Sequence, residues 1–559
     1  MTVLVVAACS DAPRPASGGG GGSGGDGSGS GDGSGSGDGS GGGMPGDGPP
    51  PGLTISQVTI DGAGNLEIRQ GGSGTLVVTG TGLDHLTAAR LGDLDLDLAA
   101  SSGTATQLRL PVQIPHGHAR QLLELTLSSA DGSAHAFAVG VSPITIEPHG
   151  HPGARGTSDD PLTLCGIAVA ERGDEVQLFP GTFTCSEPFT IARGVTIRGV
   201  ASTHTTVRGS SLQFDAQDAN PFAPTTIQGL TLEDGEISAA FTTLSVTDVA
   251  IHDTSGLNLL GAGISVLGGQ LTVTNLAVTG FVAGIQVDAS ASVTVNHYQY
   301  ANSIGIAIAL DHGDVQARDV TADPSVAGVV MTAGSLDLAD SKISSDGPAI
   351  HAGDLNTPVG TRTVTIANAL LRSNSLAITE ATTDLTVTGC TLQRGAGHPE
   401  QASSGIQLFG GTLALTGTSI NGFRFGLAVP PPFADRRDDE ATSASLDQVE
   451  IAAGDIAIGL QSLVDRGSFT LRRSHAVGQN RGLVLAGGFD TIDLGTAGSP
   501  GDNRLEVASG GPALEDTRDG GAIDLHGTTL NGMSFDGQVQ GPVSVAGAYT
   551  LTGTDTLRF

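Results

Sequence analysis

Two pairs of histidines have a spacing that could bind a metal ion. His116 and His118, and again His149 and His151, each enclose one glycine. On a strand such a pair faces one side, where both imidazoles could bind zinc. Both pairs lie beside prolines in expected turns, and no Cys or carboxylate stands at ligand spacing. We therefore expect structural or surface histidines, with no metal and no cofactor.

Two charged segments are the other places where chemistry could occur. Asp435–Glu440 reads DRRDDE and follows a run of prolines, and Glu515–Gly520 reads EDTRDG. Carboxylates in a loop can bind calcium or a substrate. The more ordinary outcome is a solvated loop, which we expect at both segments. If the protein is an enzyme, the first loop is the best place for its site.

An eight-residue pattern recurs along much of the chain, and LTVTNLAV (Leu271–Val278) is one copy. Apolar residues occupy positions 1, 3 and 8, and position 5 holds Asn, Asp or Gly. These residues tolerate positive φ, so position 5 is expected to be a corner between two short strands. The expected file of corner residues is Asp248, Asn275, Asp319, Asp340, Asn368, Gly389 and Gly417, with Gly527 near the end and weaker copies at His297, Gln448 and Arg473.

A second motif, glycine followed by alternating apolar residues, falls between these copies, as in Gly263–Val266 and Gly284–Val287. Each period therefore holds about three short strands and too few apolar residues to form a core alone. Stacking the periods at about 4.8 Å buries a continuous apolar column and pairs the backbone between coils. The pattern predicts a parallel β-solenoid, and its long, irregular period favours the right-handed β-helix.

Catalytic groups on a solenoid would stand at outward positions of neighbouring coils. Glycoside hydrolysis needs two carboxyl groups about 5 to 9.5 Å apart, and a lyase needs a base. The outward positions instead carry small or neutral residues, and a threonine ladder favours cross-strand packing. We therefore predict no catalytic residue. The outward residues are Thr272, Thr294, Gln316, Asp337, Thr365, Thr386, Ala414 and Thr470 at position 2, and Ser265, Gln286, Ala307, Val330, Gln407, Ala428 and Val484 on the glycine-led strand.

The first residues, MTVLVVAAC, resemble a bacterial lipobox, in which signal cleavage leaves a lipid-modified cysteine, here Cys9. The apolar run is shorter than a usual signal and has no Lys or Arg ahead of it, so the true start is expected upstream. Residues 1–16 are expected to be the signal remnant and anchor. The Gly/Ser/Asp-rich residues 17–51 are expected to be a disordered tether.

Residues 52–147 are predicted to form a small β-sandwich. Short runs of β-forming residues, such as TLVVTGTGL and QLRLPVQIP, alternate with turns and show no helical period. Their order, closed by LLELTLSSADG, resembles the immunoglobulin-like (Ig-like) domain shared by plexins and transcription factors, the IPT/TIG type. This resemblance implies a spacer or binding module without catalysis.

Residues 148–559 are predicted to form the solenoid. GDEVQLFPGTFTC followed by GVTIRG resembles the opening of pectin lyase-like right-handed β-helix proteins. GAIDLHGTTLNG resembles the final coils of bacterial surface β-helix proteins of undefined activity. Asp160 is expected to cap a helix that begins at Pro161 and ends before Gly173, covering the open end of the column. The predicted fold class is thus all-β, a right-handed parallel β-helix with an N-terminal Ig-like β-sandwich.

Two cysteines, Cys165 and Cys185, bracket the first expected coil. In an exported protein we expect them to form a disulfide that joins the helical cap to that coil. Cys390 follows the corner residue Gly389 and is expected to be a buried free thiol.

Composition restricts the partners. The chain has 25 Lys+Arg against 57 Asp+Glu, a net charge of −32, which argues against nucleic acid and anionic membrane surfaces. Aromatic residues make up only 3%, poor material for stacking sugar rings.

We expect a lipid-anchored monomer of the cell envelope, at the outer membrane or cell surface, that touches the membrane only through its lipid. Its expected role is non-catalytic binding or display toward a glycan or surface protein. The alternative is a polysaccharide lyase or glycoside hydrolase acting on an acidic polysaccharide, which only the fold resemblance supports.

Overall fold

The computed structural model describes residues 52–546 apart from short segments. Those segments are 132–133, 187–188, 215–223, 256–260, 289, 303–304, 325, 354–361, 381–382, 396–402, 431–441, 462–466, 488, 519–521 and 541–542. Residues from Leu53 onward form one compact unit. No helix in this described part is long and apolar enough to cross a membrane. Cys9, the expected tether and Asp435–Glu440 lie outside the described residues.

Two β-sheets enclose one apolar core at the start of this unit. Leu76 and Leu110 from the first sheet and Leu91 and Leu125 from the second are fully buried in that core. The arrangement is a β-sandwich, and its assignment to the IPT/TIG type stays a prediction. The first sheet has the order β1 (Thr54–Ile60), β3 (Ser73–Thr81), β7 (Gln107–Gln113) and β6 (Ser102–Gly103), and the second has β2 (Glu67–Arg69), β9 (Ala134–Ser142), β8 (Gln121–Ser129), β4 (Leu86–Leu91) and β5 (Leu94–Asp95).

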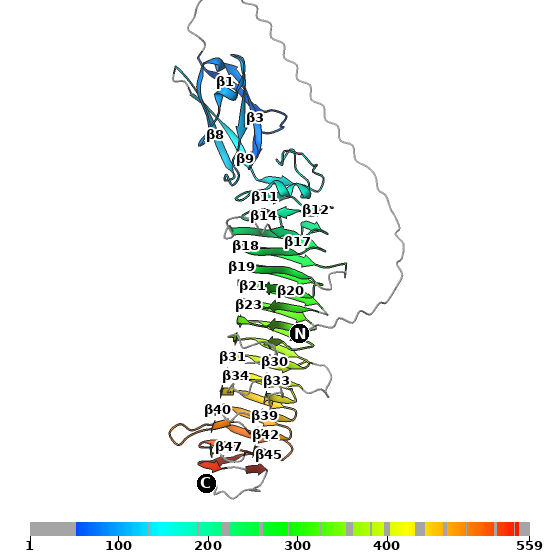
Figure 1. The fold of residues 1–559 in the computed structure, drawn as a ribbon, viewed down its shortest axis with the longest axis vertical. Helices are drawn as coiled ribbons and strands as arrows, with labels where there is room; N and C mark the ends of the chain where they lie inside the picture. The colour runs from blue at the N-terminus through cyan, green and yellow to red at the C-terminus, as the bar shows by residue number, and fades with distance from the viewer. Residues whose placement is uncertain are drawn as a thin grey trace, which may run out of the picture. The chain divides into compact units, whose positions relative to one another are not determined.

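The remaining strands form a parallel β-solenoid of about 12 turns, so the predicted all-β solenoid fold is confirmed. Up to the final coil, strands pair in parallel with strands one coil later, and the coils lie stacked in Figure 1. The first coils contain β10 (Ile144–Ile146), β11 (Glu175–Leu178), β12 (Gly181–Thr184), β13 (Thr190–Ile191), β14 (Thr196–Arg198), β15 (Thr205–Arg208) and β16 (Leu212–Phe214).

The main coils supply strands to three faces, called here the first, second and third sheets. In the earlier coils one long strand turns the corner and serves both the first and the second sheet. These strands are β17 (Pro224–Glu233), β18 (Ile237–His252), β19 (Ala262–Thr279), β21 (Ala291–Asn302) and β23 (Gly313–Pro324), and the start of β18 and β19 also reaches the third sheet.

In the later coils each sheet has its own strand. The first sheet continues with β25 (Gly334–Ala339), β28 (Arg362–Ala367), β31 (Thr383–Thr388), β34 (Gly411–Thr416), β37 (Thr442–Asp447), β40 (Gly467–Arg472), β43 (Phe489–Asp493) and β46 (Ala522–Asp524). The second continues with β26 (Lys342–Ser345), β29 (Leu370–Ser373), β32 (Thr391–Arg394), β35 (Ser419–Asn421), β38 (Glu450–Ala453), β41 (His475–Gly478), β44 (Arg504–Val507) and β47 (Thr528–Leu530). The third holds β20 (Ala283–Asp288), β22 (Ile306–Leu310), β24 (Ala327–Met331), β27 (Ile350–Ala352), β30 (Leu376–Glu380), β33 (Ser404–Leu408), β36 (Phe425–Val429), β39 (Ile456–Leu460), β42 (Arg481–Leu485) and β45 (Pro512–Asp516).

The last described strands fold back over the final coil. β48 (Met533–Phe535), β49 (Gln538–Gln540) and β50 (Val543–Ala546) pair antiparallel with β47, β46 and β45. Unpaired strand edges are prone to recruit other chains, so this reversal protects the C-terminal end of the solenoid.

A left-handed residue stands at each corner between the first and second sheets. Asn275 has φ 55° and Asp248 has φ 54°, and the strand registers put both in one file along the coils. The file also contains Gly229 and Asp502, which the sequence pattern did not single out. Its other members, all with positive φ, are His297, Asp319, Asp340, Asn368, Gly389, Gly417, Gln448, Arg473 and Gly527.

The helix predicted to cover the open end of the column is shorter in the structure and of the 3₁₀ type. The segment contains only a 3₁₀ helix, Leu164–Val169, whose N-cap residue is Thr163. Asp160 caps nothing, because its carboxylate accepts hydrogen bonds from the backbone and side chain of Arg155. Gly166 disfavours an α-helix here, and the preceding Cys165 is joined to Cys185 of the first coil by a disulfide with a Cα–Cα distance of 5.3 Å.

The expected solvated loop at Glu515–Gly520 is also wrong where the structure describes it. Glu515 and Asp516 belong to β45, and Asp516 is 1% exposed. Arg518, 7% exposed, binds both carboxylate oxygens of Asp516 at 2.9 and 3.0 Å and donates to the carbonyl of Phe489. A buried charge needs such a partner, and the pairing satisfies both residues inside the turn.

Candidate functional site

The outward side chains of the first sheet form a continuous polar surface, called here the polar face. Strand registers place them in three parallel columns, and most are Ser, Thr, Asn or Gln. The columns are Thr243, Gln270, Ser292, Asp314, Ser335, Thr363, Asp384, Thr412, Ser443 and Ser468; then Ser245, Thr272, Thr294, Gln316, Asp337, Thr365, Thr386, Ala414, Ser445 and Thr470; then Thr247, Thr274, Asn296, Arg318, Ala339, Ala367, Thr388, Thr416, Asp447 and Arg472.

The polar face repeats its hydrogen-bonding groups at the coil spacing of about 4.8 Å. Some hydroxyls bind along the column: Ser468 donates to Ser443 at 3.0 Å, and Thr412 donates to Asp384 at 2.5 Å. Others, such as Thr272 and Thr386, are exposed. The face therefore offers rows of donors and acceptors over about ten coils, some 45 Å.

The few charges on this face are mostly paired. Arg318 lies 3.8 Å from Asp337 of the next coil, and Arg472 binds Asp493. Asp337 thus stands next to a cation and has neutral residues on either side in its own column. The three columns contain four aspartates, Asp314, Asp337, Asp384 and Asp447, and two arginines, Arg318 and Arg472, so the face carries a small net negative charge while the whole chain is strongly acidic.

The third sheet corrects one predicted outward residue. Ala307 is fully buried, and Ala309 occupies the outward column between Gln286 and Val330. The same column contains His351, Thr379 and Glu515, which the sequence pattern passed over. Two adjacent apolar residues, Ala307 and Ile308, are both fully buried, so simple alternation gave the wrong register at this coil.

A second group of side chains lies on the second sheet near the C-terminal end, called here the Glu–His–Arg cluster. Glu450, His475 and Arg504 are in register on three successive coils. Glu506, two residues after Arg504, lies with Oε2 3.1 Å from His475 Nε2 and Oε1 2.6 Å from Arg504 Nε. The cluster therefore joins two carboxylates, an imidazole and a guanidinium on adjacent coils.

The partners of Glu506 control its protonation. Partial burial raises the pKa of Glu506, but hydrogen bonds and charge from Arg504 and His475 outweigh it, and the pKa is lowered from the ordinary value. Glu506 is therefore held as a carboxylate, which suits a base or an electrostatic partner and does not suit a proton donor.

The chain resembles several solved structures, while no family model and no curated protein matches it. One is the catalytic unit of a GH87 α-1,3-glucanase from Streptomyces thermodiastaticus, at 12% identity and TM-score 0.34, covering 82% of this chain and 90% of that one. A second GH87 α-1,3-glucanase catalytic domain shows 10% identity and TM-score 0.30, with coverage of 85% and 98%. The A-module of the Azotobacter vinelandii mannuronan C-5 epimerase shows 11% identity and TM-score 0.28, with coverage of 53% and 85%. These structural neighbours are carbohydrate-active catalytic domains.

The two histidine pairs do not form a joint site. His116 binds the buried Asp174 at 2.6 Å and His151 lies 3.0 Å from Asp160, so distant segments supply carboxylates that local spacing did not reveal. His118 contacts Gln121, and His149 is exposed. Within the described ranges, no group of three or more His, Cys, Asp or Glu side chains is placed to hold a metal ion.

The Glu–His–Arg cluster lies outside position 2 and the glycine-led strand, the positions at which outward residues were predicted. A usable signal exists: position 7 of the octet and the residue two further on become charged in the last copies, at Glu450, His475, Arg504 and Glu506.

Cys390 is buried with a free thiol, and burial is the main cause that raises its pKa. A neutral, buried thiol packs as a core residue and is a poor nucleophile.

Proposed function

We propose that this protein binds a neutral polysaccharide along the polar face, as a lipid-anchored protein of the cell envelope. The observation that carries the proposal is the run of hydroxyl and amide side chains in register over successive coils. Cys9 would hold the lipid, and residues 17–51 would separate the folded part from the membrane.

Several physical features support a sugar polymer as the ligand. Hydroxyl and amide groups both donate and accept hydrogen bonds, as sugar hydroxyls do. Each bond contributes only about 0.5–1.5 kcal/mol net, so useful affinity needs many repeated contacts along an extended ligand. The polar face has that length, and its low charge on a chain of net charge −32 favours a neutral glycan over an acidic one.

Binding of the purified full chain to a glycan array of neutral and acidic polysaccharides tests this proposal. T365R/T386R places two bulky cations in neighbouring coils of the polar face. T391R/S419R makes the same change in neighbouring coils of the second sheet and serves as the matched control. The first variant should lose at least tenfold in affinity for the bound glycan and the second should not; equal losses, or no bound glycan, would refute the polar face as the binding surface.

The Glu–His–Arg cluster favours a second candidate, glycoside hydrolysis. Glu450 and Glu506 lie two coils apart along the solenoid and two residues apart along the strand, so their backbone positions are about 12 Å apart. The two glutamate side chains must close this distance to reach the separation of about 6.5–9.5 Å between the carboxyl groups of inverting hydrolases. Glu506, held ionised, would activate water, and Glu450 would protonate the leaving oxygen. A lyase would instead use His475 as the base. Reducing ends or unsaturated products released by the wild type, absent in E506Q and H475N and unchanged in E515Q, would establish catalysis.

A further inference from the structure

An exposed phenylalanine lies at the corner where the third sheet passes into the polar face. Within β18, Phe241 comes after the residues that serve the third sheet and two residues before Thr243, where the polar face begins. Phe241 is 52% exposed, whereas every other aromatic residue that the structure describes is buried or partly buried. A single exposed apolar residue is ordinary, but the backbone around Phe241 is not.

The backbone of Phe241 has a left-handed conformation that phenylalanine rarely adopts. Its φ is 51°, a region that Gly, Asn and Asp tolerate and bulky residues avoid. The register places Gly268 opposite Phe241 in the next coil, with φ 70°. Because glycine adopts this conformation without strain, the corner itself does not require a phenylalanine. Residues held in strained backbone conformations cluster at functional sites.

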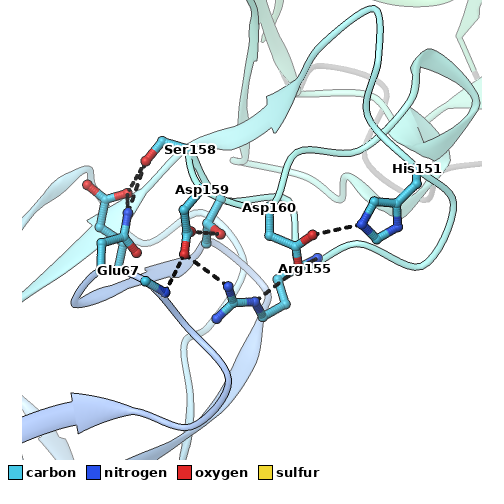
Figure 2. Close-up of polar contacts among 9 residues, drawn as sticks. Glu67, His151, Arg155, Ser158, Asp159 and Asp160 are labelled. Atoms are coloured by element: carbon cyan, nitrogen blue, oxygen red, sulfur yellow. Dashed lines mark hydrogen bonds and ion pairs between the residues drawn. The ribbon is translucent and has the colours of Figure 1, made fainter. Parts of the chain in front are cut away.

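A buried arginine supports this corner. Arg193 is 1% exposed and donates from Nη2 at 2.7 Å to the carbonyl of Ala240, the residue before the phenylalanine. Within the described residues its guanidinium forms no ion pair, and its Nε makes no hydrogen bond. Arg155 shows the usual arrangement, because it binds Asp159 at 3.0 Å and Asp160 at 3.1 Å, as Figure 2 shows. A buried charge without a counter-charge is unfavourable, and here it is placed where it fixes the strained corner.

The next coil supports the ring itself. A Cβ atom added at Gly268 would lie 2.8 Å from Cδ1 and 2.9 Å from Cε1 of Phe241. The missing side chain therefore leaves room for the ring to pack on the backbone of that coil. Leu267, 43% exposed, precedes this glycine, and Gln270 of the polar face follows it by two residues. The ring is thus held, before any ligand binds, on a coil that contributes to the polar face.

The chemistry of the corner favours a sugar as the ligand. Phenylalanine has no polar group, so it offers only apolar contact, and a pyranose ring has a C–H face suited to such contact. Thr243 lies within reach of the same ligand, because two residues of extended chain span at most about 7 Å. A stable protein partner would cover roughly 800 Å², far more than the exposed side chains of Phe241 and Leu267 provide.

We propose that Phe241 stacks against one sugar ring of the polysaccharide that binds along the polar face. This inference rests on the proposed function and adds a subsite at the end of the polar face that begins with Thr243. The phenyl ring would contact the C–H face of the sugar. Thr243 and Gln270 would exchange hydrogen bonds with its hydroxyl groups or with those of the next sugar.

A single tryptophan can report on this subsite. The chain contains no tryptophan, so F241W introduces one fluorescent reporter at the proposed contact. L122W places the same reporter at an exposed leucine of the sandwich strand β8 and is the matched control. Titration of both full-length variants with neutral polysaccharides should shift the emission of F241W to shorter wavelength and leave that of L122W unchanged. Adding T365R/T386R to F241W should raise the polysaccharide concentration needed for the shift at least tenfold.

Truncation separates the ring contact from the stability of the fold. F241A and F241G should each lower the affinity for the neutral polysaccharide about fivefold, which corresponds to about 1 kcal/mol. F241Y should keep the affinity within twofold of the wild type, and L122A should not change it. Glycine relieves the positive φ and alanine does not. Equal losses of affinity in F241A and F241G, at different thermal stability, would therefore exclude misfolding as their cause.

The outcomes separate the subsite from the polar face. If the wild type bound no neutral polysaccharide, both this inference and the proposed function would be wrong. Binding that is lost in T365R/T386R but equal in wild type and F241A would overturn the subsite alone. An emission shift of F241W that follows protein concentration instead of polysaccharide would show self-association through Phe241 and would also overturn the subsite.

Discussion

Asn275 donates a hydrogen bond from Nδ2 to Oδ1 of Asp248 at 2.7 Å, one coil away, while both residues hold positive φ. The two side chains thus link neighbouring coils at the corner where their backbones bend. Asn368 and Asp340 make the same contact at 3.2 Å, and His297 pairs with Asp319. Left-handed corners and cross-coil side-chain bonds therefore occur in the same residues.

Replacement of Asn275 tests the corner. A β-branched residue is disfavoured at φ 55° by about 1–2 kcal/mol, and valine also loses the bond to Asp248. Glycine loses that bond but adopts positive φ without strain. We expect N275V to lower the free energy of unfolding by about 2 kcal/mol and N275G by less than half of that in denaturant titrations. Equal stability of the two variants would contradict the corner role.

The disulfide between Cys165 and Cys185 should stabilise the first coil. It closes a loop with a sequence separation of 20 residues, for which loop entropy predicts about 3 kcal/mol. C165S/C185S should therefore unfold at lower temperature than the wild type in non-reducing buffer. C390S is the control, since Cys390 is free. Adding reductant should lower the melting temperature of the C390S variant as much as that of the wild type. If reductant did not lower the melting temperature of the wild type, the stabilising role of the disulfide would be wrong.

The buried pair Asp516–Arg518 should respond strongly to loss of one partner. D516N leaves the guanidinium of Arg518 buried without a counter-charge, which costs about 3–5 kcal/mol. The neighbouring pair Arg481–Glu515 is more exposed, so R481Q should cost under about 1 kcal/mol. Chemical denaturation of both variants measures the loss in free energy of unfolding. Similar losses would show that burial does not determine the cost of breaking an ion pair.

Glu506 should titrate below the ordinary glutamate range. Arg504 and His475 bind its charged form, and its pKa is lowered, against an ordinary value of about 4.3. Because the folded-state pKa is depressed, this group stabilises the fold above its unfolded pKa, and the stabilisation is lost as pH falls through the folded pKa. An NMR titration should give Glu506 a midpoint below that of exposed glutamates, and R504Q should raise it. An unshifted midpoint in R504Q would show that Arg504 does not hold the carboxylate ionised.

The sequence pattern predicted side-chain burial correctly where it depends on residues close together in the chain. Alternation in Leu271–Val278 separates buried from exposed side chains, and the structure buries Leu271, Val273 and Val278. The pattern failed where two adjacent apolar residues are both buried and interrupt the alternation, as at Ala307 and Ile308. It also failed where a distant segment supplies the partner, as Asp174 does for His116.

By itself, then, the sequence determined the all-β class, the coil repeat and the mostly neutral character of the outward position-2 residues, because these depend on residue type at a short period. Only the tertiary structure decided which coils lie in register, that Asp516 and Arg518 are buried together, and that His475 meets Glu506. It also decided that Arg193 meets the carbonyl of Ala240 two coils later. These depend on how loops of unequal length return the chain to the next coil, and no local period encodes that distance.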